Sequence, residues 1–269
     1  MFDMAPRVVG GLRCVLGEGP VWDKATQRLV LTDAAQKTVY SLDPVNGLAR
    51  SYPVAEQLTA LVPSDNDRWF GVYGRTIGRF DFRYGSLKPL LVLPGPADVE
   101  LNDAVCGRDG KLNVGSVDRT GSNRGELYAI APTLEATVVA GGVGASNGLD
   151  TSPDGTVLYH ADTFTSVVTA YPSGRTIRVD RPDGLAVDSE GFLWAALWGS
   201  GAVRRYSPSG DLVQTVKLPV PLVTNVAFGG PGLSTMFITT ARSVGLPSSG
   251  AVFAADVGVT GLTAMPFTV

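Results

Sequence analysis

Short apolar runs recur along this chain of 269 residues at a nearly constant spacing. In each unit the first run contains one apolar residue that aligns with those of the other units: Val21, Leu61, Val105, Leu149, Leu185 and Val226. These positions are separated by 40, 44, 44, 36 and 41 residues, so six units fill the chain. A period of about 40–45 residues with several strands in each unit is typical of β-propeller blades, whereas a β-sandwich needs no fixed period.

Each unit continues with two further apolar runs that turn residues separate. In the first unit the runs cover residues 20–22, 28–32 and 38–42. Turns such as Asp65-Asn66-Asp67 supply the residue types that tight hairpins need. β-Branched and aromatic residues dominate the runs, and no stretch keeps a helical period. The sequence therefore predicts an all-β, six-bladed β-propeller that forms one domain over residues 1–269, with residues 8–15 supplying a strand that closes the ring.

Composition argues against several classes of function. The formal net charge is −3 and Lys and Arg do not cluster, which argues against nucleic acid as a partner. No glycine-rich motif opens a helix, so nucleotide binding has no support. The amino terminus lacks the basic start and apolar run of a secretion signal, and no run reaches the length of a membrane span. We therefore expect a cytoplasmic protein with no membrane partner.

Cysteine and histidine are too few to build a typical zinc site or an imidazole-based catalytic site. Cys14 and Cys106 lack the spacing of zinc ligands, and we expect two buried free thiols. His160 is the single histidine, and a structural, hydrogen-bonded imidazole is expected. Any catalytic proton transfer is therefore expected from carboxylates.

Polar side chains precede the aligned apolar residues, at the point where the innermost strands of a propeller begin and converge on the central channel. The candidates, one from each unit, are Glu18, Thr59, Asn102, Asn147, Asp183 and Thr224. Four of them are Glu, Asn, Asn and Asp, which offer only oxygen donors and two negative charges, a set that suits one hard divalent cation. A dipeptide such as Asn147-Gly148 is by itself typical of an ordinary turn. Recurrence at the same place in successive units favours a shared metal instead.

Five short motifs follow one another in a specific order. They are Gly17-Glu18-Gly19-Pro20-Val21-Trp22, Leu101-Asn102-Asp103, Ser146-Asn147-Gly148-Leu149, Pro182-Asp183-Gly184-Leu185 and Val226-Ala227-Phe228-Gly229-Gly230. The series resembles the successive motifs of the family of gluconolactonase, regucalcin (senescence marker protein) and luciferin-regenerating enzyme. The resemblance covers nearly the whole chain.

This resemblance implies a propeller with a divalent metal in its central channel. The family's metal ligands correspond to Glu18, Asn147 and Asp183, and Asp183 also corresponds to the residue given the proton-transfer role. Asn102 corresponds to the asparagine beside the metal that helps hold substrate or water. Calcium is the first expectation for the ion, with zinc, magnesium, manganese and iron also found in such proteins.

The predicted activity is metal-dependent hydrolysis of a lactone, a sugar lactone or related small cyclic ester, to the hydroxy acid. The cation would polarise the lactone carbonyl, and water activated by the metal or by Asp183 would attack it. Two alternatives stay open. The same scaffold and cation would also suit phosphotriester or other ester hydrolysis, and a non-enzymatic metal-binding propeller would use the channel site only for structure.

The rim of the predicted pocket departs from the family pattern. Sugar-lactone enzymes of the family often have Arg two positions before the asparagine that corresponds to Asn102, whereas this chain has Glu100. We expect Glu100 to accept hydrogen bonds from substrate hydroxyls, to pair with Arg119 or Arg124, or to remain a solvated loop residue. Trp198 is expected either to stack on a ligand or to cover the propeller. The full set of predicted substrate contacts is Asn102, Glu100, Asp103, Arg119 and Trp198.

Overall fold

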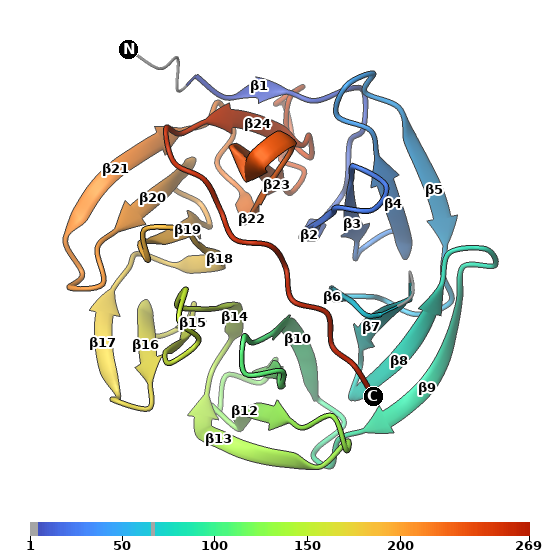
Figure 1. Cartoon of the computed structure of the whole chain (residues 1–269), viewed down its shortest axis with the longest axis vertical. Helices are drawn as coiled ribbons and strands as arrows, with labels where there is room; N and C mark the ends of the chain where they lie inside the picture. The colour runs from blue at the N-terminus through green and yellow to red at the C-terminus, as the bar shows by residue number, and fades with distance from the viewer. Residues whose placement is uncertain (1–4, 66–67) are drawn as a thin grey trace.

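The computed structural model describes residues 5–65 and 68–269, which form a ring of six four-stranded antiparallel sheets (Figure 1). The predicted six-bladed, all-β propeller is confirmed. Two sequence-based expectations touch residues outside the described ones: the turn at Asp65-Asn66-Asp67 and the character of the first residues of the amino terminus. No helix in the described part of the chain is long and apolar enough to cross a membrane.

Each blade runs from an inner strand at the channel to an outer strand at the circumference (Figure 1). The inner strands are β2 (Gly17–Asp23), β6 (Ala60–Pro63), β10 (Val99–Cys106), β14 (Ser146–Thr151), β18 (Pro182–Val187) and β22 (Val223–Gly229). The second strands are β3 (Arg28–Asp33), β7 (Trp69–Tyr73), β11 (Leu112–Asp118), β15 (Leu158–Asp162), β19 (Leu193–Leu197) and β23 (Thr235–Thr240).

Third and outer strands complete the blades. The third strands are β4 (Thr38–Leu42), β8 (Thr76–Asp81), β12 (Gly125–Ile130), β16 (Val167–Tyr171), β20 (Ala202–Tyr206) and β24 (Phe253–Asp256). The outer strands are β5 (Ala49–Pro53), β9 (Ser86–Val92), β13 (Ala136–Val143), β17 (Arg175–Arg178), β21 (Leu212–Lys217) and β1 (Arg7–Val8). The one helical segment among the described residues is the short 3₁₀ turn η1 (Pro231–Leu233).

The amino-terminal segment closes the ring, as the sequence predicts. Strand β1 pairs antiparallel with β24 and so becomes the outer strand of the last blade. It is shorter than the predicted strand over residues 8–15, because Gly10 adopts a left-handed φ of 61° and packs against the backbone of Gly47. Because β1 pairs with β24, the third strand of the last blade has no unpaired edge.

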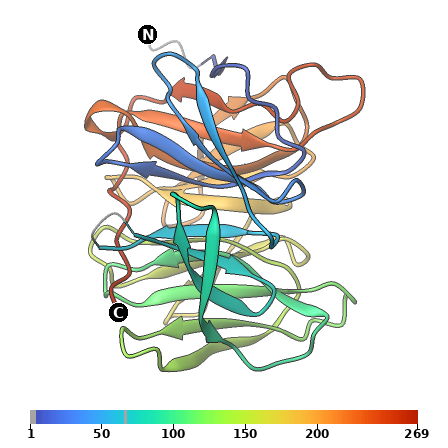
Figure 2. The same ribbon diagram turned by 90° about the vertical axis from the view of Figure 1, so that its right-hand side faces the viewer.

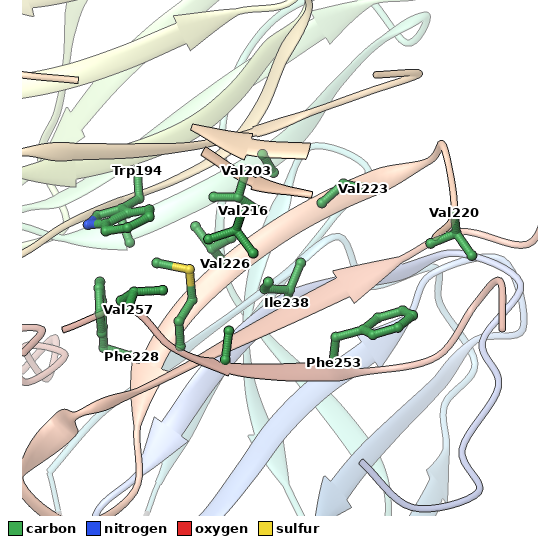
Figure 3. Close-up of a cluster of buried hydrophobic side chains, with 14 of the residues drawn as sticks. Trp194, Val203, Val216, Val220, Val223, Val226, Phe228, Ile238, Phe253 and Val257 are labelled. Atoms are coloured by element: carbon green, nitrogen blue, oxygen red, sulfur yellow. The ribbon is translucent and has the colours of Figure 1, made fainter. Parts of the chain in front are cut away.

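Neighbouring blades pack face to face through apolar side chains that alternate along the strands. Figure 3 shows one such interface, in which Trp194, Val203 and Val216 of one blade meet Ile238 and Phe253 of the next. All five side chains are almost fully buried. The alternation explains why the apolar runs of the sequence are short and rich in β-branched residues.

The carboxy-terminal segment crosses one end of the channel after β24 and runs along that face of the ring (Figures 1 and 2). Gly261 forms a β-bridge with Asp188, directly after β18. Phe267 is fully buried, its ring centroid lies 5.6 Å from that of Phe70, and its N–H donates to the carbonyl of Pro63, the last residue of β6. The segment therefore covers the end of the channel at which the inner strands finish.

Candidate functional site

The inner strands are irregular at the positions of the predicted site residues. The pairing of inner and second strands slips between Leu101 and Ala104, between Ser146 and Leu149 and at the corresponding places of other blades. The candidates that lie in or beside such an irregularity are Glu18, Asn102, Asn147, Asp183 and Thr224. A β-bulge breaks the strict alternation of side chains and re-aims the residue that it contains. The bulges thus put one polar side chain of each of these five blades at the start of its inner strand.

Glycines next to two of these residues allow neighbouring inner strands to approach closely. A Cβ on Gly148 would lie 2.2 Å from the backbone nitrogen of Leu185, and one on Gly184 would lie 2.0 Å from the side chain of Asn225. Asn147 and Asp183 lie within strands β14 and β18, so the interpretation of their dipeptides as ordinary turns is wrong. The glycines serve close backbone approach.

Two carboxylates come together in this part of the channel. Burial raises the pKa of Glu18, and the nearby charges of Asp183 and Asp103 raise it further. Burial also raises the pKa of Asp183, again with a contribution from Asp103. Within the described residues neither Glu18 nor Asp183 forms an ion pair with Lys, Arg or His. Buried carboxylates without a cationic partner favour either protonation or a bound cation.

An amide network lies beside the carboxylates. The Nδ2 of Asn102 donates to the Oδ1 of Asn147 at 2.8 Å and to the carbonyl of Ser146 at 2.9 Å. The Nδ2 of Asn147 donates to the Oγ1 of Thr163 at 2.7 Å. With its nitrogen held by Thr163, Asn147 keeps a second lone pair on Oδ1 for another ligand.

The donor set fits a hard divalent cation. Glu18 and Asp183 would supply carboxylate oxygens and Asn147 an amide oxygen, which are ligands that calcium and magnesium accept. Among the described residues no group of three or more His, Cys, Asp or Glu side chains is arranged to hold a metal.

Glu100 and Arg119 form an ion pair. The Nε and Nη2 of Arg119 lie 2.8 and 2.7 Å from the Oε2 of Glu100, and both side chains are more than a third exposed. Of the three alternatives for Glu100, the structure adopts pairing with Arg119, while Arg124 binds Asp98 and Asp118 instead. The negative charge of Glu100 is thereby largely compensated.

Trp198 lies between two blades. Its side chain is half-buried. Its backbone N–H donates to the carbonyl of Arg181 at 3.1 Å, and its backbone forms a β-bridge with Leu222 of the next blade. It therefore follows the second strand of its blade on the side where the inner strands begin, as expected. Stacking on a ligand remains a prediction.

Asp103 lies near Glu18 and Asp183 and also lines a cavity of the channel. A cavity of about 120 Å³ is lined by Asp103, Asp150 and Asn225 and is covered by residues 262–265 of the carboxy-terminal segment. It lies farther along the inner strands than Glu18 and Asp183, which do not line it. Burial raises the pKa of both Asp103 and Asp150 to about 6. A substrate contact by Asp103 stays a prediction.

Sequence reasoning missed several polar residues of the channel. Asp150 stands two positions after Gly148 in one of the aligned strand runs, and a carboxylate at this place was the available signal. In the last blade Asn225, one position beyond the predicted Thr224, lines the cavity. Thr163 follows a second strand and carries no marker in the sequence.

The remaining reactive side chains are structural, as expected. Cys14 and Cys106 are buried free thiols, and burial raises the pKa of each to about 12. The Nε2 of the buried His160 lies 2.8 Å from the Oγ of Ser146. Burial lowers the pKa of His160 to about 4, so the imidazole is neutral at physiological pH.

Comparison with known proteins identifies the family of this chain. Residues 16–242 match the family model described as the SMP-30/Gluconolactonase/LRE-like region. The chain belongs to this family. A relative, the 6-deoxy-6-sulfogluconolactonase of Pseudomonas putida, is 33% identical, with 92% of this chain and 93% of the relative covered. Regucalcin of Bos taurus is 30% identical, with 95% of each chain covered.

Solved structures agree with the fold. A calcium-binding regucalcin from Agrobacterium tumefaciens has a TM-score of 0.91 and 24% sequence identity, and the match covers 100% of this chain and 99% of the other. A luciferin-regenerating enzyme has a TM-score of 0.89. The family inferred from five ordered motifs is confirmed by the match to the family model and by the 33% identical relative.

Proposed function

We propose that this member of the SMP-30/gluconolactonase family is a divalent-metal-dependent lactonase that opens a sugar lactone or related small cyclic ester to the hydroxy acid. The observation that carries the proposal is the grouping of Glu18 and Asp183, two carboxylates that form no ion pair with the described residues, beside the amide of Asn147. The names of relatives, a sulfogluconolactonase and a pentonolactonase, support lactones as the substrate class.

Glu18, Asn147 and Asp183 are the proposed ligands of the ion, with calcium the first candidate. A regucalcin described as calcium-binding shares the fold and supports this choice. When bound, a divalent cation supplies Lewis-acid polarisation of the lactone carbonyl.

The chain's own residues would handle the proton and the substrate. Asp183 is the proposed general base, because it is a carboxylate among the proposed ligands and can accept a proton from water held beside the ion. Water oxygen bonds to the acyl carbon, the ring C–O bond breaks, and the ring oxygen receives a proton. The other proton of the water is released as the new carboxylic acid ionises. Asn102 would orient the substrate or the attacking water through its amide.

Substrate would enter where the inner strands begin, since the carboxy-terminal segment covers the other end of the channel. Glu100, Arg119 and Trp198 are the proposed contacts at this entrance. Because Glu100 and Arg119 compensate each other, the pair offers hydrogen-bond donors and acceptors with little net charge. Such a pair suits a polyhydroxylated substrate.

The test is a pH-stat screen of a lactone panel with metal-stripped protein that is reloaded with calcium, zinc, magnesium, manganese or iron. We expect stripping to abolish lactone opening and one ion to restore it. Turnover of phosphotriesters or open-chain esters in preference to every lactone would favour the alternative hydrolase. Loss of thermal stability on stripping, without hydrolysis of any substrate under any ion, would favour the non-enzymatic propeller.

Asp183→Asn tests the proposed base. We expect a loss of about 10²–10⁴-fold in kcat, the usual contribution of a general base, and a larger loss if the ion also dissociates. Steady-state kinetics with saturating metal measures kcat, and circular dichroism verifies the fold. Asp180→Asn is the matched control, since Asp180 is near in sequence and only accepts a hydrogen bond from Ser200. Normal turnover by Asp183→Asn would contradict the assignment.

A further inference from the structure

Side chains of one blade bind backbone carbonyls of the next at the level of the candidate site. In five of the six blade junctions of the described chain, a polar side chain donates to the carbonyl directly before the next blade's polar candidate. The pairs are Thr32 to Leu58, Thr59 to Leu101, Asn102 to Ser146, Thr163 to Pro182 and Thr224 to Gly17. This ring of hydrogen bonds fixes the backbone from which each candidate side chain projects.

Thr163 differs from the other members because it contacts one proposed metal ligand and the peptide bond that leads into a second. Its Oγ1 accepts a hydrogen bond from the Nδ2 of Asn147 at 2.7 Å. The same hydroxyl donates to the carbonyl of Pro182 at 2.6 Å, and this carbonyl belongs to the peptide bond that leads into Asp183. One side chain thus connects the ligands of two neighbouring blades.

The directions of these two bonds are determined by chemistry. An amide NH₂ group only donates and a backbone carbonyl only accepts, so the single hydroxyl proton must point to Pro182 and a lone pair to Asn147. A carboxamide oxygen in place of the Asn147 nitrogen would leave two acceptors facing the hydroxyl with one proton between them. Thr163 therefore sets which end of the Asn147 amide faces away from it, and that end is the ligand oxygen.

The backbone around Thr163 is itself firmly held. Its N–H donates to the carbonyl of Ala145 at 3.0 Å. The carboxylate of Asp162 accepts hydrogen bonds from the N–H groups of Gly144, Ala145 and Phe164, each at 3.0 Å. The hydroxyl is thus placed by a rigid turn before any ligand binds.

We propose that Thr163 is a positioning residue that holds Asn147 and Asp183 in the relative geometry that the cation requires. The proposal rests on the metal site of the proposed function. Some residues do not touch a metal but orient its ligands. Their mutation commonly lowers metal affinity by about 10–100-fold.

Thr163→Val is the decisive variant, because it keeps the shape of the side chain and removes the hydroxyl. It removes the acceptor of the Asn147 Nδ2, so that of the two bonds only the one from Asn102 to the Asn147 Oδ1 still orients this amide, and it leaves the Pro182 carbonyl without this donor. We expect divalent-metal affinity to fall about 10–100-fold. Thr163→Ser retains the hydroxyl and is expected to bind metal nearly as the natural protein does. Calorimetric titration of metal-stripped protein with calcium and with manganese measures both affinities without reference to turnover.

Thr165→Val is the matched control. It lies in the same turn, and its hydroxyl bonds only the carbonyl of Asp162, at 3.3 Å. Equal metal affinity of Thr163→Val and the natural protein, with a fall only in the stability of the metal-free fold, would show a structural role and overturn the proposal. Failure of the natural protein to bind any divalent ion would overturn the metal site itself, and with it this inference. If the natural protein binds metal but opens no lactone, the proposed activity is wrong. Weaker metal binding by Thr163→Val would still support the positioning role of Thr163 in that case.

Discussion

Two partly buried acids are the most unusual single residues of this protein. Asp103 and Asp150 line a cavity of the channel, and burial raises the pKa of each from 3.8 to about 6. Backbone N–H groups lower these pKa values only in part: Ala104 donates to Asp103, and Val187 to Asp150. The fold therefore keeps carboxylic acids where their charged forms are disfavoured.

These shifts predict that the stability of the metal-free protein falls as pH rises. Between pH 3.8 and about 6 the folded chain retains protons that the unfolded chain releases, so ionisation favours unfolding. The raised pKa values of Glu18 and Asp183 act in the same direction. His160 acts in the opposite direction, because its folded pKa of about 4 lies below 6.5.

Urea unfolding of metal-stripped protein across this pH range provides the measurement. Asp150→Asn removes one titrating acid, so its stability should fall less steeply with pH than that of the natural protein. Asp154→Asn is the control, since hydrogen bonds from Ser152 and Thr156 lower the pKa of Asp154 instead. An identical pH slope for Asp150→Asn and the natural protein would contradict the expectation.

The inner strands line the channel and also carry the proposed metal ligands. Their bulges put Glu18, Asn147 and Asp183 out of strict alternation, and the glycines beside these residues let one inner strand lie against the next. The proposed ligand set, drawn from separate blades, would need both features, because each strand would supply one donor. The relative placement of the strands therefore controls the site.

Gly148→Ala should disturb this placement. The added Cβ would meet the backbone of Leu185 at 2.2 Å, a contact that only movement of β18 can relieve. We expect a loss of stability of about 1–3 kcal/mol, the usual cost of overpacking, and weaker metal binding through displaced Asp183. Thermal and urea unfolding, with metal titration, measure both effects. Gly141→Ala, which has nothing within 4 Å of its added Cβ, is the control and should change neither. Unchanged stability in Gly148→Ala would show that the strands adjust freely.

Taken whole, the propeller has two different channel ends. The proposed site lies at the end where inner strands begin, while residues 262–265 cover the cavity towards the other end. Phe267 secures this cover by packing into the core formed with Phe70, Leu101 and Leu112. The packing of Phe267, which stabilises the cover, is therefore at the opposite end of the channel from the residues proposed to carry out the reaction.

Phe267→Ala should therefore cost stability and spare catalysis. Removal of this fully buried ring should lower the free energy of unfolding by about 3–5 kcal/mol. At temperatures where the variant is folded, kcat/KM for a lactone should be unchanged. Urea unfolding and steady-state kinetics provide the two readouts, with Val269→Ala, which is 42% exposed, as the control. A large fall in kcat/KM with stability intact would link the covered end to the reaction.

The sequence by itself determined the blades and located the candidates. Each blade is a local unit of consecutive hairpins, so a repeat of Val21, Leu61 and their equivalents records it directly. Equivalent places in a repeat become equivalent places around a ring, which is why Glu18 and Asp183, 165 positions apart, were assigned to one site. Chain order and strand period are enough for these conclusions.

Tertiary structure decided how the side chains are partnered. Three contacts join residues that no local pattern in the sequence relates. Glu100 pairs with Arg119 and not with Arg124, Thr163 donates to the carbonyl of Pro182, and Phe267 packs against Phe70. Each depends on the distance between blades and on the direction of a few hydrogen bonds, which are fixed only when the ring closes and the blades pack.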